Sequence, residues 1–144
     1  MAQFTPLRIV VGSSDCDTLG LMNVANYYSY SSLAGREFQR LIGWPPGQAN
    51  KGRRFSFAVV RAESDFRAEV LEGQAILVTT SVGSIGEKSA TFLHQIALED
   101  GTEVYSSVWR SVLMNLDTRR SEYIPDDLRQ ALQAHLVDDP DLAL

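Results

Sequence analysis

The sequence predicts an α+β fold in which a five-stranded antiparallel sheet wraps around one long helix, with a short helix at the C-terminus. A single stretch has the three-to-four-residue apolar spacing of a long helix, and it follows one short strand-like stretch. Four stretches after it are rich in the β-branched and aromatic residues that strands favour. Because one helix cannot cover both faces of such a sheet, we expect the sheet to curve around it.

The first strand is expected at residues 7–11, and a polar loop of turn-forming residues follows at 12–20. The long helix is expected to begin at Val24, with Asn23 as its N-cap. Apolar or small side chains then recur every three or four residues, which places them on one face. These residues are Tyr27, Ser31, Ala34, Phe38 and Leu41. Gly43 and the prolines after it predict the end of the helix.

The remaining elements lie in the second half of the chain. Strands are expected at residues 57–66, 74–82, 90–98 and 104–115. Hairpin-length connections at 83–86 and 99–101 join the last three strands, which we expect to form an antiparallel meander. The short C-terminal helix is expected at 126–137, after Pro125.

Length and composition indicate one domain over residues 1–144, with a core at about 7–125 and a C-terminal helix and tail at 126–144. The net charge of -5 disfavours nucleic-acid binding, which depends on clustered Lys and Arg. The single cysteine, Cys16, cannot form an internal disulfide, and no Cys/His cluster suggests a metal site. The sequence shows no signal peptide and no apolar run of the ~20 residues that a membrane span needs. We therefore expect a cytoplasmic protein with no metal, cofactor, nucleic-acid or membrane partner.

Asp15 and Asp17 lie in the loop that leads into the long helix. The first N–H groups of a helix lack intrahelical partners and lie at the positive end of its dipole. A carboxylate here therefore lies beside donors that can stabilise an anion. Thioester hydrolysis needs both a group that attacks or activates water and a donor for the developing oxyanion. An acidic loop before a helix more commonly serves capping and turn formation, so the residues alone fit either role.

Residues 15–27 read Asp-Cys-Asp-Thr-Leu-Gly-Leu-Met-Asn-Val-Ala-Asn-Tyr and resemble the signature of the 4-hydroxybenzoyl-CoA thioesterase family. That signature is Asp, any residue, Asp, two residues, Gly, a short stretch and Asn-Tyr, followed by a long helix. Weaker similarities extend from residue 7 to about residue 125. The resemblance implies the hot-dog fold and the hydrolysis of an acyl-CoA thioester.

By this resemblance the second Asp of the signature, Asp17, is the catalytic carboxylate and acts as nucleophile or general base. The oxyanion donor maps onto the backbone N–H of Val24. Asn23 can cap the helix, orient Asp17 or touch the thioester, and we favour capping over direct catalysis. Many relatives carry a His shortly after the signature Gly. No residue from 21 to 28 is His here, so Asp17 is expected to work with backbone donors alone.

Two other candidates for catalysis are set aside. Another branch of the fold uses a Glu on the central helix, but Glu37 lies more than three turns from the helix start. We interpret Glu37 as structural, paired with Arg36 or Arg40. Cys16 has no nearby His to activate it and is rejected as a nucleophile.

Hot-dog sites form between two subunits, so the resemblance places the strand that contains Arg61 opposite the Asp17 loop of a partner. Arg61 would polarise the substrate or hold Asp17 ionised, although an inter-subunit ion pair is favoured. Lys88 and Ser89, in a hairpin loop, would meet the phosphates of CoA. Tyr28 is expected to line the acyl pocket or the dimer interface.

A basic cluster and a lone His are two further candidates, and for each an ordinary structural role is at least as consistent with the sequence as a functional one. The basic cluster Lys51, Arg53 and Arg54 would meet either a phosphate group or an acidic carrier protein, or form a solvated surface. His94 lies in the middle of a strand, where a lone His is usually structural.

The leading hypothesis is therefore an acyl-CoA thioesterase that releases a carboxylic acid and free CoA, with CoA as part of the substrate. One alternative is a hot-dog hydratase or dehydratase, for which the His of the proton shuttle is missing from the helix-adjacent loop. The other is a non-catalytic protein that binds acyl thioesters. We expect a homodimer or homotetramer, and either CoA or an acyl-carrier protein as the thioester donor.

Overall fold

The computed structural model describes residues 3–45 and 52–138. The elements are β1 (Leu7–Val10), a 3-10 turn η1 (Ser13–Asp15), α1 (Val24–Leu41), β2 (Phe55–Phe66), β3 (Ala75–Ile85), β4 (Ser89–Leu98), β5 (Glu103–Asn115), β6 (Arg120–Ser121) and α2 (Asp126–Gln133).

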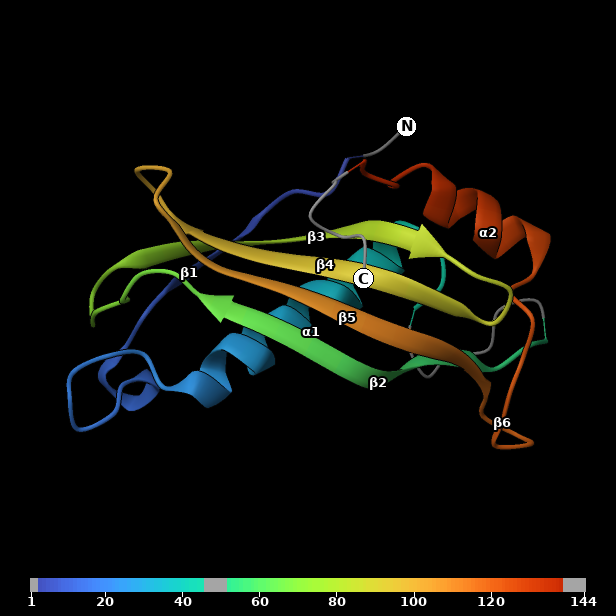
Figure 1. Cartoon of the computed structure of the whole chain (residues 1–144), viewed down its shortest axis with the longest axis horizontal. Helices are drawn as coiled ribbons and strands as arrows, with labels where there is room; N and C mark the ends of the chain where they lie inside the picture. Colours follow the sequence, from blue (N-terminus) through green and yellow to red (C-terminus); the bar gives the residue numbers. More distant parts are fainter. Residues whose placement is uncertain (1–2, 46–51, 139–144) are drawn as a thin grey trace.

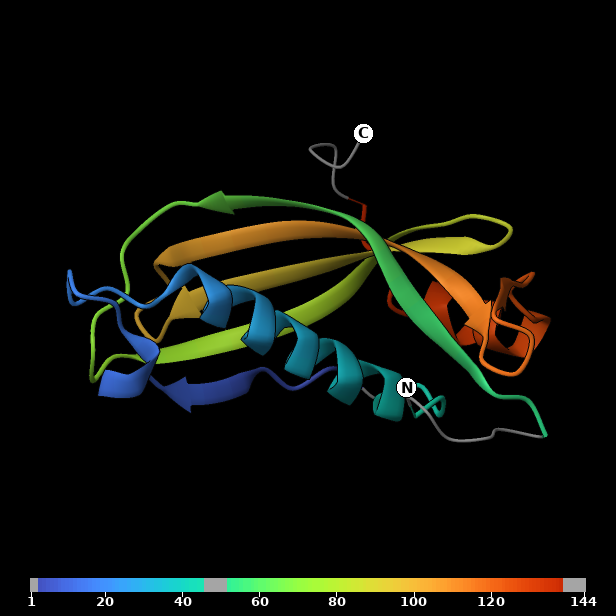
Figure 2. The same cartoon turned by 90° about the horizontal axis from the view of Figure 1, so that it is seen from below.

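The sheet has the strand order β1-β3-β4-β5-β2, and every neighbouring pair is antiparallel. The two-residue β6 pairs with β5. In Figure 1 the strands lie across α1, and Figure 2 shows the sheet curving over that helix. This confirms the predicted five-stranded sheet wrapped around one long helix and the predicted meander of β3, β4 and β5.

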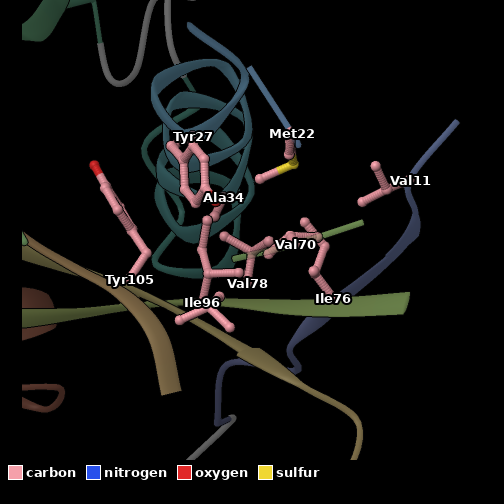
Figure 3. Packing of buried hydrophobic residues seen from close by; sticks show 10 residues of the cluster. Val11, Met22, Tyr27, Ala34, Val70, Ile76, Val78, Ile96 and Tyr105 are labelled. Carbon is pink, nitrogen blue, oxygen red and sulfur yellow. The ribbon is translucent and has the colours of Figure 1, made fainter. Parts of the chain in front are cut away.

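Of the five residues predicted for one face of α1, four are buried, namely Tyr27, Ser31, Ala34 and Phe38. The fifth, Leu41, is half-buried. One apolar cluster forms where the N-terminal half of α1 meets the sheet. In Figure 3, Tyr27 and Ala34 lie over Val78 of β3 and Ile96 of β4. Burial of such side chains is worth about 1.5–3 kcal/mol for each large residue, which fixes α1 against the sheet.

A second apolar cluster holds the C-terminal half of α1. Phe38 is fully buried there and packs with Val82 and Leu113 of the sheet and with Leu128 and Leu132 of α2. The short C-terminal helix therefore closes the end of the molecule that lies farthest from the Asp17 loop (Figure 1).

Two local predictions were wrong, and one short strand was missed. β3 continues to Ile85, so Gly83 and Ser84 belong to the strand and the turn follows at 86–88. The register against β4 shifts between Val82 and Ser84, which is a bulge that accommodates one extra residue. α2 ends at Gln133 instead of residue 137, because Leu136 instead bridges Val82 of β3. The short strand β6 was not predicted.

Candidate active site

The loop before α1 is held in a tight, hairpin-like form around Asp17. Cys16 and Met22 form an antiparallel bridge, and the Asp17 N–H donates to the Leu21 carbonyl at 2.8 Å. Gly20 has a φ of +79°, a conformation that favours glycine, and its N–H donates to the Asp17 carbonyl at 3.1 Å. The loop thus returns on itself and brings Asp17 beside the segment that enters α1.

The Asp17 carboxylate is exposed and only one of its oxygens is engaged. Oδ1 accepts hydrogen bonds from the N–H groups of Leu19 at 2.9 Å and Leu21 at 3.2 Å. Within residues 3–45 and 52–138, Oδ2 makes no hydrogen bond. The side chain is therefore fixed in direction through Oδ1, while Oδ2 is accessible to a substrate or a water molecule.

Asp15 holds this loop to α1. Its Oδ1 accepts from Asn26 Nδ2 at 2.8 Å, its carbonyl accepts from the same Nδ2 at 3.2 Å, and its Oδ2 accepts from the Gly12 N–H at 2.9 Å. Burial, together with a hydrogen bond to Asp15, raises the pKa of Tyr30 to about 12. Asn26, the Asn of the Asn-Tyr pair in the signature, therefore links the loop to the helix. The spacing of the sequence did not reveal this role.

The start of α1 offers one unoccupied backbone donor. Asn23 is the N-cap, as predicted, because its Oδ1 accepts from the Ala25 N–H at 3.0 Å. The Asn26 N–H donates to the Asn23 carbonyl at 2.9 Å. No partner among the described residues accepts from the Val24 N–H. A free carboxylate oxygen and a free helix N-terminal donor therefore lie on the same loop-and-helix junction.

Tyr28 connects this junction to the sheet. Its ring stacks on Trp109 of β5 with a centroid distance of 6.1 Å, and its hydroxyl oxygen accepts from Ser64 Oγ at 3.2 Å. The side chain is 37% exposed, so it is accessible to a ligand or to another subunit.

The other predicted binding residues lie away from Asp17 within one chain. Arg61 is exposed in β2 and pairs with Glu63 of the same strand. Lys88 and Ser89 lie at the turn between β3 and β4, at the opposite end of the sheet from the Asp17 loop (Figure 1, Figure 2). Lys88 Nζ is 4.7 Å from the centroid of the Tyr123 ring. Within one chain, Asn23, Val24 and Tyr28 lie at the start of α1, which the Asp17 loop enters, whereas the cationic residues lie on other elements.

Two residues of the predicted basic cluster form contacts within the chain, whereas Lys51 lies outside the described residues. Arg53 pairs with Asp127 at 2.9 Å, and its guanidinium carbon is 4.9 Å from the Trp44 ring centroid. Arg54 pairs with Asp117 at 2.9 Å.

A cavity of about 230 Å³ lies between α1 and the sheet. Its helix side is formed by Ser31, Ser32, Gly35, Arg36 and Gln39, and its sheet side by Ser56, Phe57, Val59, Phe92, His94, Trp109 and Ser111. This cavity was not predicted from the sequence, because its walls come from a helix and strands that are far apart along the chain.

No group of three or more His, Cys, Asp or Glu side chains in the described ranges is placed to hold a metal ion. None of the described helices is both long and apolar enough to cross a membrane. Glu37 pairs with Arg40, one of its two predicted partners.

Comparison with known proteins places the chain in one family. The model of the thioesterase-like superfamily matches residues 11–132. A predicted thioesterase from Bacillus stearothermophilus is 27% identical, with a TM-score of 0.79 over 94% of this chain and 98% of that one. None of the curated proteins compared with this chain matches it.

Two structures with lower identity share the same hot-dog fold. A gentisyl-coenzyme A thioesterase is 24% identical, with a TM-score of 0.77 over 88% of this chain and 98% of that one. A 1,4-dihydroxy-2-naphthoyl-CoA thioesterase from Synechocystis is 16% identical, with a TM-score of 0.77 over 90% of this chain and 95% of that one.

Proposed function

Because the chain belongs to the thioesterase-like superfamily and is a thioester hydrolase of the hot-dog fold, we propose that it hydrolyses an acyl-CoA to a carboxylic acid and free CoA. Asp17 is the catalytic carboxylate. The observation that carries this assignment is the pairing of a fixed carboxylate with a free Oδ2 and the unoccupied N–H of Val24 at one junction.

The chemistry follows from these two groups. Asp17 Oδ2 attacks the thioester carbonyl or removes a proton from the attacking water, and the carbonyl oxygen gains negative charge. When the carbonyl re-forms, the C–S bond breaks and CoA leaves as the thiolate, which takes up a proton that comes from water. On the nucleophilic route, water then hydrolyses the acyl-Asp17 anhydride and releases the carboxylic acid. The Val24 N–H donates to that oxygen, assisted by the positive end of the α1 dipole. A well-placed donor of this kind lowers the barrier by roughly 3–4 kcal/mol. Asn23 contributes by capping the helix and leaving the Val24 N–H free.

The complete site needs a second subunit, and we propose a homodimer formed along β2. β2 is the long edge strand, and its outer edge has no partner strand in the described part of the chain. Val59 and Val60 are 49% and 60% exposed there, which is unusual for a soluble edge strand unless another chain covers it. In such a dimer Arg61 lies at the interface, and Lys88 and Ser89 reach the CoA of the site on the other subunit.

The dimer is tested by placing a charge on this edge. Val60→Glu is expected to give a monomer in sedimentation velocity and to lose thioesterase activity. Gln95→Glu, at an exposed position of β4, is the control and is expected to keep both the dimer and the activity. A tetrameric wild type would show that dimers associate further. A dimeric, active Val60→Glu variant would contradict assembly through β2.

We propose that CoA, and not an acyl-carrier protein, carries the acyl group of the substrate. This is supported by two proteins that share the fold and are named as gentisyl-CoA and 1,4-dihydroxy-2-naphthoyl-CoA thioesterases. The single free thiol, Cys16, fits the reducing cytoplasm as the site of action. The test is thiol release from a panel of acyl-CoAs and the matching acyl-carrier-protein thioesters. We expect turnover of at least one acyl-CoA, with the carrier-protein thioester slower. Water addition to an enoyl thioester, or tight binding without thiol release, would instead identify a hydratase or a binding protein.

A further inference from the structure

A row of polar side chains crosses the sheet beneath α1. Thr80 of β3, His94 of β4, Ser107 of β5 and Ser64 of β2 are register partners in turn, and the first three are buried. This polar row lies between the two apolar clusters that hold the two halves of α1. Among the described residues, the side chains of Thr80 and His94 hydrogen-bond only to each other, so apolar side chains at these two positions would join the clusters without leaving a buried partner unsatisfied. This pair therefore calls for an explanation other than stability.

Hydrogen bonding within the polar row is nearly complete. Ser107 Oγ accepts from Trp109 Nε1 at 2.7 Å and donates to the Glu63 carbonyl at 3.0 Å. Ser64 Oγ lies 2.8 Å from Ser107 Oγ. Thr80 Oγ1 lies 2.8 Å from His94 Nδ1. Within residues 3–45 and 52–138, His94 Nε2 makes no hydrogen bond. This nitrogen is the unused hydrogen-bonding atom of the polar row.

The helix–sheet cavity lies directly against His94. The imidazole, Phe92 and Trp109 form its sheet side, and Ser31 and Gly35 form part of its helix side. Ser31 Oγ is buried and has no hydrogen-bond partner in the described part of the chain, so it is a second unsatisfied polar group at the cavity. Burial lowers the pKa of His94 to about 3, so the ring is neutral at working pH. A neutral ring nitrogen can bond to a hydroxyl in either tautomer, since a hydroxyl both donates and accepts.

The cavity continues the face of α1 that begins at the proposed oxyanion donor. Val24, Tyr28, Ser31 and Gly35 follow one another at steps of three or four, so they form one stripe along the helix. Ser31 lies about two turns, or roughly 10 Å, from Val24. A thioester carbonyl at Val24 can therefore direct a short acyl group along this stripe toward His94.

The volume of the cavity suits an acyl group that carries one ring. The cavity is about 230 Å³, whereas a cavity of about 150 Å³ is large enough to hold benzene. One ring with a small substituent therefore fits inside it.

We propose that His94 determines substrate specificity: the helix–sheet cavity takes the acyl group, and His94 Nε2 hydrogen-bonds to a polar substituent at the end remote from the thioester. The substrate is then a compact acyl thioester with a hydroxyl or similar group at that end. The kinetic test of this inference rests on the proposed acyl-CoA hydrolysis. The binding test does not, because it measures affinity without turnover.

The test compares phenylacetyl-CoA with its ring-hydroxylated isomers, one hydroxyl position at a time, by thiol release. We expect the wild type to favour at least one hydroxylated isomer by 10-fold or more in kcat/KM. The double variant Thr80→Val, His94→Leu removes the imidazole without leaving the threonine hydroxyl unpartnered, and its preference is expected to fall below 2-fold. Gln95→Ala, on the exposed face of the same strand, serves as the control and keeps the wild-type preference.

A second variant guards against misfolding. Gly35→Ala should fold, because alanine is the better helix former and its Cβ would stand 3.4 Å from His94 Cε1, a tolerable contact. The methyl group narrows the cavity beside the imidazole, so KM for the ring substrates is expected to rise at least 5-fold. An unchanged KM in Gly35→Ala, or a hydroxyl preference that survives in the double variant, would overturn the proposal.

A binding measurement separates this inference from the proposed function. Titration calorimetry of the same CoA thioesters into Asp17→Asn reports the preference of the cavity without turnover. Preference for a hydroxylated isomer in Asp17→Asn, lost when Thr80→Val and His94→Leu are added, supports the role of His94 even if no thioester is hydrolysed. Equal affinity for all isomers would refute that role even if hydrolysis is rapid.

Discussion

Acid should destabilise this protein through His94, and the size of the effect follows from its burial. Desolvation lowers the pKa of the folded imidazole from its ordinary value of 6.5 to about 3. Between these two values the unfolded chain binds a proton at His94 that the folded chain does not. The contribution of His94 to stability is therefore fully present above pH 6.5 and falls as the pH is lowered, by about 1.4 kcal/mol per pH unit. The full interval amounts to about 5 kcal/mol, a large part of a typical unfolding free energy of about 5–15 kcal/mol.

Urea unfolding at a series of pH values from 7 to 4 measures this loss. The double variant Thr80→Val, His94→Leu should lose about 1.4 kcal/mol less per pH unit than the wild type. Glu99 and Asp100 have lowered pKa values, through Arg8 and through hydrogen bonds from Thr102, so they also lose stabilisation in acid. Their contribution is the same in both proteins and cancels in the comparison. Equal slopes in wild type and variant would refute the claim that His94 is buried in its neutral form.

Three further substitutions test the packing and the active-site loop. Asn23→Ala removes the α1 cap and should lower Tm by about 2–4 °C, which corresponds to about 1 kcal/mol. If Asn23 acts only as a cap, Asn23→Ser should match the wild type in both Tm and activity, because Ser also caps helices. Asn26→Ala removes both hydrogen bonds to Asp15, so we expect a loss of about 1–2 kcal/mol in urea unfolding and a fall in kcat larger than the change in KM. Phe38→Ala empties a fully buried position and should cost about 3–5 kcal/mol by the same unfolding assay. A Phe38→Ala loss below 1 kcal/mol, or an unchanged kcat in Asn26→Ala, would contradict the respective contacts.

Most of the fold follows from local patterns. The apolar steps from Tyr27 to Phe38 predict both α1 and the face that it buries, because helix periodicity depends only on the sequence. The turn between β3 and β4 was misplaced because Gly83 looks like a turn residue, whereas pairing with β4 makes it part of a bulge. That outcome depends on a register that neighbouring residues do not encode.

The site was predictable only in part. The signature predicts roles for Asp17, Asn23 and Val24, and these residues lie in the loop before α1 and at the start of that helix. The polar row and the cavity were not foreseen, because His94 meets Thr80 and Ser107 only through pairing of three strands. An isolated His in a strand looks structural until its neighbours across the sheet are known.

The most direct test of the central claim is thiol release by Asp17→Asn, because the substitution keeps the shape of the side chain but removes its basicity and its nucleophilic oxygen. Asp138→Asn, an exposed Asp near the other end of the fold, is the matched control. With the best acyl-CoA of the panel, we expect kcat of Asp17→Asn to fall at least 100-fold, with little change in acyl-CoA affinity or Tm, and kcat of Asp138→Asn to match the wild type. Wild-type turnover by folded Asp17→Asn would contradict the assignment of Asp17 as the catalytic carboxylate.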